Sequence, residues 1–285
     1  MKGLGLYDGK IVDLNKPAVL LEDRGYQFGD GVYDAWKVVD GKHFLRKEHL
    51  DRLERSCRLL DIKPCYSREE IEGFSDSLVE ESGVNDGAMY LQWTRGWESP
   101  RSHVFNENLR PLLSGSIIPI PPLPLDAWTT GNKVITYPDQ RHLFCHIKTL
   151  NLLGSIMAKN AAHRNDCEEA LLVREHQGRS IVTECSSSNC FAVKDGVMYT
   201  APLGNLILPG ITRAAILGLA GQCEINVVEE YVSPEFFKEA DEAFFTNAIA
   251  IRPIVMIDGR PVGSGNVGPV FQKLNAKYQK MMRGN

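Results

Sequence analysis

The chain has 285 residues, of which 43% are hydrophobic and 24% charged, and its formal net charge is −4. This composition is typical of a folded protein of two domains, and the small negative charge argues against nucleic acid or an anionic membrane as a partner. No uncharged apolar run reaches the roughly 18 residues that a membrane-spanning helix needs. The seven cysteines are scattered without a CxxC pair, which is typical of reduced thiols and predicts a cytoplasmic protein.

The first half of the chain shows strand and helix patterns in turn. Strands are predicted over residues 10–13, 18–21, 31–39, 42–45 and 87–94, with a hairpin turn at Asp40-Gly41. Two amphipathic helices lie between the last two of these strands, with apolar stripes formed by Leu50, Leu53, Cys57 and Leu60 and by Ile71, Phe74 and Leu78. In the segment 87–94 apolar side chains alternate, so one face of that strand should be buried.

Four prolines within residues 119–124 mark a connector, because proline joins neither a central strand nor a helix interior. We therefore expect an N-terminal α/β domain over 1–118, a linker over 119–126 and a C-terminal domain over 127–285. In the second half, helices are predicted over 149–164, 212–220, 234–239 and 266–281, and strands over 170–174, 180–183, 189–194, 225–231, 242–247 and 252–257. Hairpins mixed with helices predict α/β domains with antiparallel or mixed sheets, an α+β arrangement, rather than a doubly wound Rossmann fold.

Lys148 lies in the apolar segment Cys145-His-Ile-Lys-Thr-Leu-Asn-Leu-Leu-Gly154, just before a predicted helix. Desolvation and the positive helix N-terminus both disfavour the ammonium form of such a lysine, and a neutral lysine amine is what Schiff-base chemistry needs. Taken alone, a lysine of this kind is more often a surface residue whose stem covers apolar atoms. The residues downstream decide between the two interpretations.

Two downstream segments offer a carboxylate and an anion site. Glu184 lies among hydroxyl residues in Val182-Thr-Glu-Cys-Ser-Ser-Ser-Asn189, and Leu208-Pro-Gly-Ile-Thr-Arg213 is a glycine turn that opens a helix. The free N–H groups and the dipole of such a helix start suit a phosphate. A lysine, a carboxylate and a phosphate site together describe a pocket for pyridoxal phosphate.

With these motifs, the chain resembles the fold-type IV pyridoxal-phosphate enzymes, the family of branched-chain and D-amino-acid aminotransferases. The similarity runs from Leu21-Glu-Asp-Arg-Gly-Tyr-Gln-Phe-Gly-Asp-Gly31 to Ile257-Asp-Gly259. It implies two α/β domains with the cofactor between them. It also implies that Lys148 binds the cofactor covalently and moves the substrate proton, and that Glu184 pairs with the pyridine nitrogen.

The resemblance assigns further side chains to the cofactor. Arg52, in His49-Leu-Asp-Arg-Leu53, matches the family arginine that binds phosphate, although taken alone it would be read as a solvated helix residue. The other cofactor-binding residues that it implies are Ser187, Ser188, Leu208, Ile211, Thr212, Thr246 and Asn247. Two positions depart from the family pattern, since Cys185 replaces a glycine and Asn247 replaces a small hydroxyl residue.

The segment Thr94-Arg-Gly-Trp-Glu-Ser-Pro-Arg-Ser-His103 resembles the substrate loop of the D-amino-acid aminotransferases, with one residue more and with Trp97 inside it. The resemblance implies that Arg101 and His103 reach the active site of the partner subunit in a homodimer and bind the substrate carboxylate, with Tyr33 nearby. It implies ping-pong transfer of amino groups between D-amino acids, such as D-alanine and D-glutamate, and 2-oxo acids. The alternatives are a branched-chain L-amino-acid aminotransferase, an (R)-selective amine transaminase and, more distantly, an aminodeoxychorismate lyase.

Two other interpretations have less support. Cys145 with His142 and His146 could suggest a metal site, but no second ligand cluster accompanies them in the sequence, so no metal is expected. A non-enzymatic cofactor-binding or scaffolding protein on the same fold would be expected to have lost Lys148 or Glu184, and both are present.

Overall fold

The computed structural model describes residues 3–121 and 128–284. The chain divides into two compact units, of which the first holds residues 1–122 with the short segment 147–151 and the second holds 123–146 and 152–285. The short segment contains Lys148, so the predicted catalytic lysine belongs to the first unit although it follows the predicted linker in sequence. Residues 122–126 of that linker lie outside the described residues, and Pro119 is the last residue of a strand.

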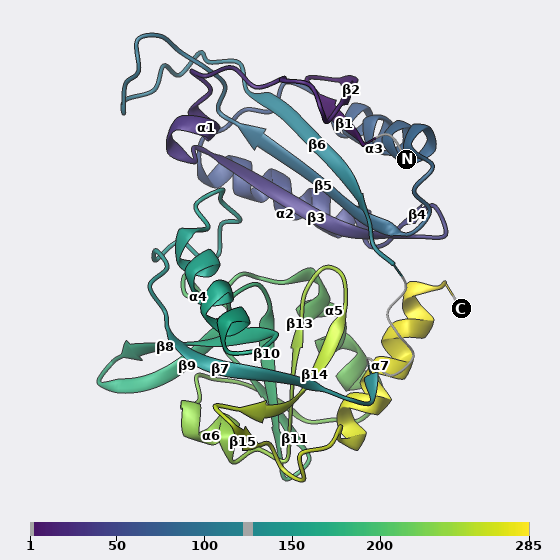
Figure 1. Cartoon of the computed structure of the whole chain (residues 1–285), viewed down its shortest axis with the longest axis vertical. Helices are drawn as coiled ribbons and strands as arrows, with labels where there is room; N and C mark the ends of the chain where they lie inside the picture. The colour runs from purple at the N-terminus through teal and green to yellow at the C-terminus, as the bar shows by residue number, and fades with distance from the viewer. Residues whose placement is uncertain (1–2, 122–127, 285) are drawn as a thin grey trace. The chain divides into compact units, whose positions relative to one another are not determined.

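In the described part of the first unit, six strands form one antiparallel sheet in the order β2-β1-β6-β5-β3-β4 (Figure 1). The strands are β1 (Leu4–Tyr7), β2 (Lys10–Asp13), β3 (Gly31–Val39), β4 (Lys42–His43), β5 (Gly87–Thr94) and β6 (Leu112–Pro119). The helices are α1 (Arg24–Phe28), α2 (Arg46–Leu59) and α3 (Arg68–Ser82). Helices α2 and α3 cover one face of this sheet (Figure 1).

The alternation of side chains along β3 and β5 gives the first sheet one apolar and one polar face. Trp36, Met89 and Trp93 are fully buried in the apolar core of this unit, together with residues of α2 and α3. Tyr33 and Gln92 lie opposite each other in the register of the same two strands and point to the other face. The segment 147–151 lies alongside β3, where Thr149 forms a bridge with Val32.

In the described part of the second unit, nine strands form a mixed sheet in the order β12-β11-β10-β13-β14-β7-β8-β9, with β15 paired to β14. The strands are β7 (Asn132–Pro138), β8 (Glu169–His176), β9 (Arg179–Cys185), β10 (Asn189–Lys194), β11 (Val197–Thr200), β12 (Val227–Glu229), β13 (Glu242–Thr246), β14 (Ile251–Ile257) and β15 (Arg260–Pro261). The helices are α4 (Leu153–Arg164), α5 (Ile211–Gln222), α6 (Pro234–Lys238) and α7 (Pro269–Met282).

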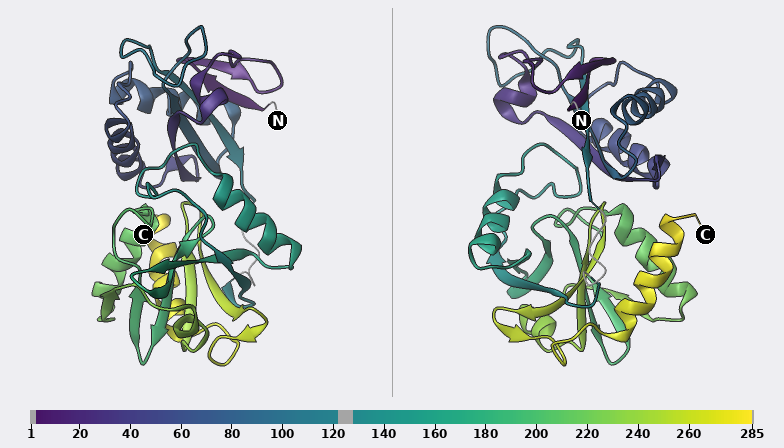
Figure 2. Two further views of the ribbon diagram at one scale, coloured as in Figure 1. Left: turned by 90° about the vertical axis from the view of Figure 1, so that its left-hand side faces the viewer. Right: turned by 45° about the vertical axis from the view of Figure 1, so that its right-hand side comes forward.

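Aromatic and small side chains pack the helices of the second unit onto its sheet. Phe244 of β13 stacks on Phe191 and contacts Phe271 of α7, and α7 runs beside α5 (Figure 2). Helix α4 packs Ala158 and Ala162 against β7 and β8. None of the helices within the described ranges is long and apolar enough to span a bilayer.

The predicted α+β class is confirmed, and the strands predicted over 10–13, 31–39, 87–94 and 189–194 match β2, β3, β5 and β10 residue for residue. Two local predictions are wrong. Residues 18–21 form no strand, and Leu21 is 79% exposed. The helix predicted over 149–164 begins only at Leu153, because residues 147–151 are extended along β3 instead.

Candidate active site

Lys148 lies against the first unit's sheet, next to Tyr33. The segment 147–151 bonds to β3 from Tyr33 N to Lys148 O (2.9 Å) and from Leu150 N to Gly31 O (3.1 Å). The Lys148 Nζ atom lies 4.3 Å from the centroid of the Tyr33 ring, a cation–π distance. The structure therefore brings these two predicted residues together. Helix α4 begins only at Leu153. The prediction that a helix N-terminus directly after Lys148 disfavours its ammonium form is therefore wrong.

Arg52, on α2, forms a buried cluster with Asp34 and His49. It donates from Nε to Asp34 Oδ2 and from Nη2 to Asp34 Oδ1, both at 2.8 Å, and His49 Nδ1 lies 2.7 Å from Asp34 Oδ1. Burial alone would raise the pKa of Asp34, but the Arg52 charge and these hydrogen bonds hold it well below its usual value. One helix turn further, the Nη2 atom of Arg55 is buried without a hydrogen-bond partner in the described ranges, so it can donate to an anion.

Arg101 and His103 lie in the exposed loop between β5 and β6 and rest on a ring of α1. The Arg101 guanidinium carbon lies 4.2 Å from the centroid of Phe28, and the His103 ring lies 5.3 Å from it, centroid to centroid. Trp97 of the same loop pairs with Asp23 through a backbone bridge. Both side chains of the predicted substrate pair are exposed, so they are accessible to a carboxylate.

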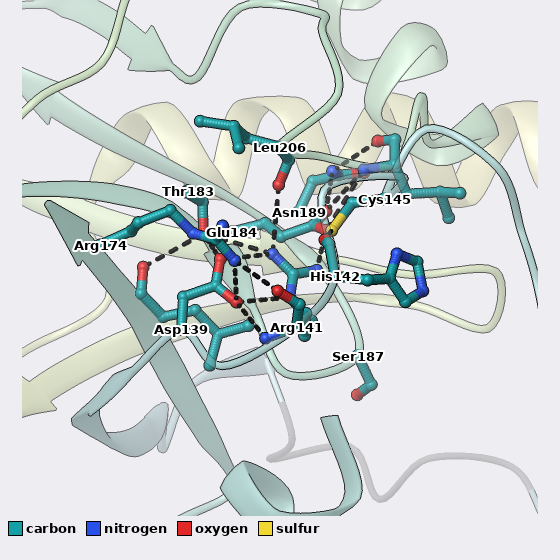
Figure 3. Close-up of polar contacts among 12 residues, drawn as sticks. Asp139, Arg141, His142, Cys145, Arg174, Thr183, Glu184, Ser187, Asn189 and Leu206 are labelled. Atoms are coloured by element: carbon teal, nitrogen blue, oxygen red, sulfur yellow. Dashed lines mark hydrogen bonds and ion pairs between the residues drawn. The ribbon is translucent and has the colours of Figure 1, made fainter. Parts of the chain in front are cut away.

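Glu184, near the end of β9, lies at the centre of a network of polar contacts in the second unit (Figure 3). Its buried carboxylate accepts hydrogen bonds from Asn189 Nδ2 (2.8 Å), from Leu208 N (3.2 Å) and from Nη1 of Arg141. Asn189 Nδ2 also donates to Leu208 O at 2.9 Å. The backbone N–H of Leu208 is thus engaged with Glu184, and its side chain remains for contact with a cofactor.

Arg141, which the sequence did not reveal, divides its charge between two carboxylates (Figure 3). Its Nε and Nη2 atoms donate to Asp139 at 3.0 Å each, and its Nη1 atom donates to Glu184. Arg174 pairs with Asp139 as well, at 3.1 Å. Burial alone would raise the pKa of Asp139, but these two arginines lower it to about 2. For Glu184, burial outweighs the single Arg141 contact and raises the pKa.

Ser187 and Ser188 donate to a buried carboxylate that the sequence did not reveal either. The hydroxyl groups of Ser186, Ser187 and Ser188 all donate to Glu169, at 2.8 Å for Ser188, and Ser187 N donates to it at 3.2 Å. Their hydroxyl protons are thus engaged, which leaves the serine oxygens as acceptors. Glu169 anchors the turn between Glu184 and β10.

The start of α5 and the end of β13 offer hydrogen-bond donors. Gly210 has no side chain to cap α5, so the N–H groups of Ile211 and Thr212 have no acceptor within the helix. A Cβ at position 210 would lie 2.0 Å from Asn189 Oδ1, so any other residue there would displace the amide that binds Glu184. Thr246 lies opposite Asn189 across β10 and β13, and its buried hydroxyl oxygen has no partner among the residues that the structure describes.

Asn247 closes the turn that follows β13. Its Oδ1 atom accepts from Ile249 N (3.0 Å) and Ala250 N (3.1 Å). The carbonyl end of this amide therefore shapes the backbone, and its Nδ2 group is left as a donor.

No metal cluster is found in the described parts of the chain, where no group of three or more His, Cys, Asp or Glu side chains could hold an ion. The Cys145 thiol donates to His142 O at 3.1 Å. Burial raises the pKa of Cys145 to about 11, so this sulfur is a protonated thiol rather than the thiolate that binds metals.

The predicted site residues therefore fall into separate groups. Lys148, Tyr33 and Arg52 belong to the first unit, and Arg101 and His103 lie together on a loop of that unit. The second unit contains Glu184, Ser187, Ser188, Leu208, Ile211, Thr212, Thr246 and Asn247.

Comparison with known proteins identifies the family. The family model described as amino-transferase class IV matches residues 31–257. The chain is 42% identical over 276 residues to a D-alanine aminotransferase of Listeria monocytogenes serotype 4b (strain F2365), and the match covers 96% of this chain and 94% of that protein. The protein belongs to the class IV aminotransferase family.

Solved structures of branched-chain amino acid aminotransferases share the fold. The enzyme of the thermophilic archaeon Thermoproteus uzoniensis, with norvaline, superposes with a TM-score of 0.86 at 27% identity, over 100% of this chain and 96% of that one. The Escherichia coli enzyme superposes with a TM-score of 0.90 over the same shares of the two chains. Its 22% identity makes this second likeness one of fold alone. A third branched-chain enzyme, from T.th., was solved with pyridoxamine 5'-phosphate and superposes with a TM-score of 0.87 at 25% identity, again over 100% and 96% of the two chains.

Proposed function

We propose that this protein is a pyridoxal-phosphate-dependent transaminase that moves amino groups between D-amino acids, such as D-alanine and D-glutamate, and 2-oxo acids. The observation that supports this most is the 42% identity to a D-alanine aminotransferase over 96% of the chain. The exposed pair of Arg101 and His103 supports the same substrate class, because a guanidinium beside an imidazole binds a carboxylate well.

The side chains present fit pyridoxal phosphate. Thr246 has a buried hydroxyl oxygen without a partner in the described ranges, and the N–H groups that open α5 have no acceptor within the helix, so both suit a phosphate. Glu184 is a buried carboxylate that shares its arginine with Asp139, so a protonated pyridine nitrogen would complete its charge balance. The third of the branched-chain relatives described above contains pyridoxamine 5'-phosphate, the amino form of this cofactor.

When bound, the cofactor supplies an aldehyde that captures amines and a ring that withdraws electrons from the α-carbon of the substrate. Lys148 is the residue that would bind the aldehyde, and its Nζ atom, once released, moves the proton at the substrate α-carbon. Glu184 accepts the hydrogen bond of the ring N–H, and Arg141 holds that carboxylate in place.

The other predicted residues hold the cofactor and orient the substrate. The phosphate is assigned to Arg52, Ile211, Thr212, Thr246 and Asn247, with further cofactor contacts from Ser187, Ser188 and Leu208. Arg101 and His103 bind the substrate carboxylate, with Tyr33 near that carboxylate and beside Lys148. Fixing the carboxylate in this way leaves the α-hydrogen of only one enantiomer directed at Lys148, and we propose that it is the D form.

The active enzyme is proposed to be a homodimer in which Arg101 and His103 serve the active site of the partner subunit. Leu153, Ile156 and Met157 lie on one side of α4 and are 73%, 51% and 50% exposed in the single chain. Apolar surface of this kind typically marks a protein interface. All seven cysteines are free thiols, which is typical of a reducing compartment, and we place the enzyme in the cytoplasm.

Subunit mixing tests the shared site. We expect a Lys148→Ala chain to be nearly inactive by itself and an Arg101→Ala chain to have weakened activity. A mixture of the two chains should recover activity, because one of the two sites in a mixed dimer has both residues. Absence of recovery after verified subunit exchange would mean that the loop serves its own subunit or no site.

A stereospecific panel tests the proposed reaction. The purified enzyme, loaded with pyridoxal phosphate, is assayed with D- and L-alanine, D-glutamate, L-leucine and (R)-1-phenylethylamine against a 2-oxo acid. We expect D-alanine and D-glutamate to be used in preference to the others. Preference for L-leucine would move the enzyme to the branched-chain type, and preference for the amine would make it an amine transaminase.

A further inference from the structure

Arg24, the first residue of α1, is a buried arginine that holds the substrate loop. Its side chain is 4% exposed, and its Nε atom donates to Asp30 Oδ2 at 2.8 Å. Its Nη1 atom binds the Glu98 carboxylate and donates to Ser102 O at 2.6 Å, and its Nη2 atom donates to His103 O at 3.2 Å. One guanidinium therefore ties three points of the loop between β5 and β6 to α1.

These three points lie on both sides of Arg101 along the chain. Helix α1 also presents Phe28 to the loop, with the Arg101 guanidinium carbon 4.2 Å and the Arg24 guanidinium carbon 4.9 Å from the centroid of its ring. The Phe28 ring and the Arg24 guanidinium thus support the exposed pair of Arg101 and His103. Without the hydrogen bonds of the Arg24 guanidinium, this exposed loop would have fewer contacts to fix its conformation.

We propose that Arg24 is a positioning residue for substrate recognition, one that sets where Arg101 and His103 meet the substrate carboxylate without touching the substrate itself. This inference rests on the proposed function of Arg101 and His103. Its effect should therefore appear in substrate binding and should disappear when Arg101 is absent.

The chain offers a matched control in Arg95. This residue is also buried, pairs with Asp30 (2.9 Å) and stacks on Phe105, with its guanidinium carbon 3.7 Å from the ring centroid. Its other hydrogen bonds go to Leu60 O and Asp61 O, away from the segment 98–103. If the fold alone mattered, Arg24→Met and Arg95→Met would act alike.

The test measures kcat and KM for D-alanine in the holoenzyme for Arg24→Met, Arg95→Met, Arg101→Ala and the double variant Arg24→Met/Arg101→Ala. We expect Arg24→Met to raise KM by roughly tenfold or more, with a smaller change in kcat, and Arg95→Met to leave KM within about twofold. The double variant should be no worse than Arg101→Ala, because two residues that act through one contact are not additive.

Equal KM values for Arg24→Met and Arg95→Met, or multiplied effects in the double variant, would overturn the proposal. If Arg24→Met does not fold, Glu98→Gln removes the charged loop partner from a more exposed position, and the same rise in KM, reduced to a few-fold, is expected. An unchanged KM in Glu98→Gln would then contradict the proposal. A wild-type enzyme inactive on D-alanine, or an Arg101→Ala variant with normal KM, would instead show that the proposed function has failed.

Discussion

Each unit of the molecule buries a carboxylate beside an arginine, and the two pairs differ in how the charge is balanced. In the first unit, Asp34 engages two nitrogens of Arg52, and its pKa is held well below the usual value. In the second unit, Glu184 shares Arg141 with Asp139, which takes two of the three guanidinium nitrogens. Burial therefore raises the pKa of Glu184.

The difference separates a carboxylate that stabilises the fold from one that is suited to chemistry. A buried acid with an arginine of its own is compensated, and removing it takes away the charge that balances the buried arginine. A buried acid that shares its arginine lacks positive charge, which a protonated ring nitrogen would supply. Substitution of Asp34 should therefore harm stability, whereas substitution of Glu184 should harm catalysis.

The largest expected effect comes from substitution of Lys148, because the catalytic role proposed for Glu184 requires a cofactor bound at Lys148. Lys148→Ala should lower turnover by roughly 10⁴-fold, because the amine that binds the cofactor and the group that moves the proton are lost together. Steady-state assays with D-alanine measure the loss. Lys133→Ala, at an exposed lysine of β7, is the control and should retain wild-type turnover.

In the cofactor-free protein, Asp34→Asn should lower stability by about 3–5 kcal/mol at neutral pH, since it removes the carboxylate that balances the buried charge of Arg52. The pKa of Asp34 is lowered in the folded state from its usual 3.8, so its contribution is complete well above that pH and is lost as the pH falls through the folded-state value. Urea unfolding midpoints of the wild type and the variant at pH 7 measure the loss. Asp76→Asn, at an exposed partner of Arg46, should cost less than about 1 kcal/mol. Equal losses in the two variants would remove Asp34 from the comparison.

Glu184→Gln should lower kcat by roughly 10²- to 10³-fold while the cofactor stays bound and stability stays close to that of the wild type. The neutral amide no longer favours a protonated ring nitrogen. Turnover and the absorbance of bound cofactor are measured together, with Glu175→Gln, at an exposed glutamate of β8, as the control. A normal kcat would show that Glu184 is a structural carboxylate like Asp34.

Arg101→Ala should reduce kcat/KM for D-alanine by roughly 30- to 150-fold, the value of a charge-assisted contact with the substrate carboxylate. Carboxylate-free (R)-amines should lose far less. Arg110→Ala is the control within the same loop, because Arg110 pairs with Asp8 at 2.8 Å and is given no role in substrate binding. If both variants lose activity equally, the loop acts through its overall charge rather than through Arg101.

Alternation made the first sheet partly predictable. In β3 and β5 every second residue is buried against α2 and α3, so their ends could be placed from the sequence. Strand β6 escaped prediction because Gly115 and Pro119 weaken the pattern. A Cβ on Gly115 would lie 2.6 Å from Tyr90 O, so packing between strands, which is not visible locally, selects the glycine.

The candidate site was predictable where motifs are local and unpredictable where partners are distant. Lys148, Glu184 and the start of α5 stand in recognisable segments. Arg141 meets Glu184 across 43 residues, and Glu169 meets Ser188 across 19. The only local sign of Arg141 is an acid two residues before it, which is too common to indicate a site.

The most direct test of the account is to find which lysine binds the cofactor. The holoenzyme is treated with borohydride, which fixes the cofactor to the amine that holds it, and the modified peptide is then mapped. We expect the label on Lys148 alone. A label on another lysine, such as Lys133 or Lys159, would contradict the assignment of Lys148 as the reacting amine.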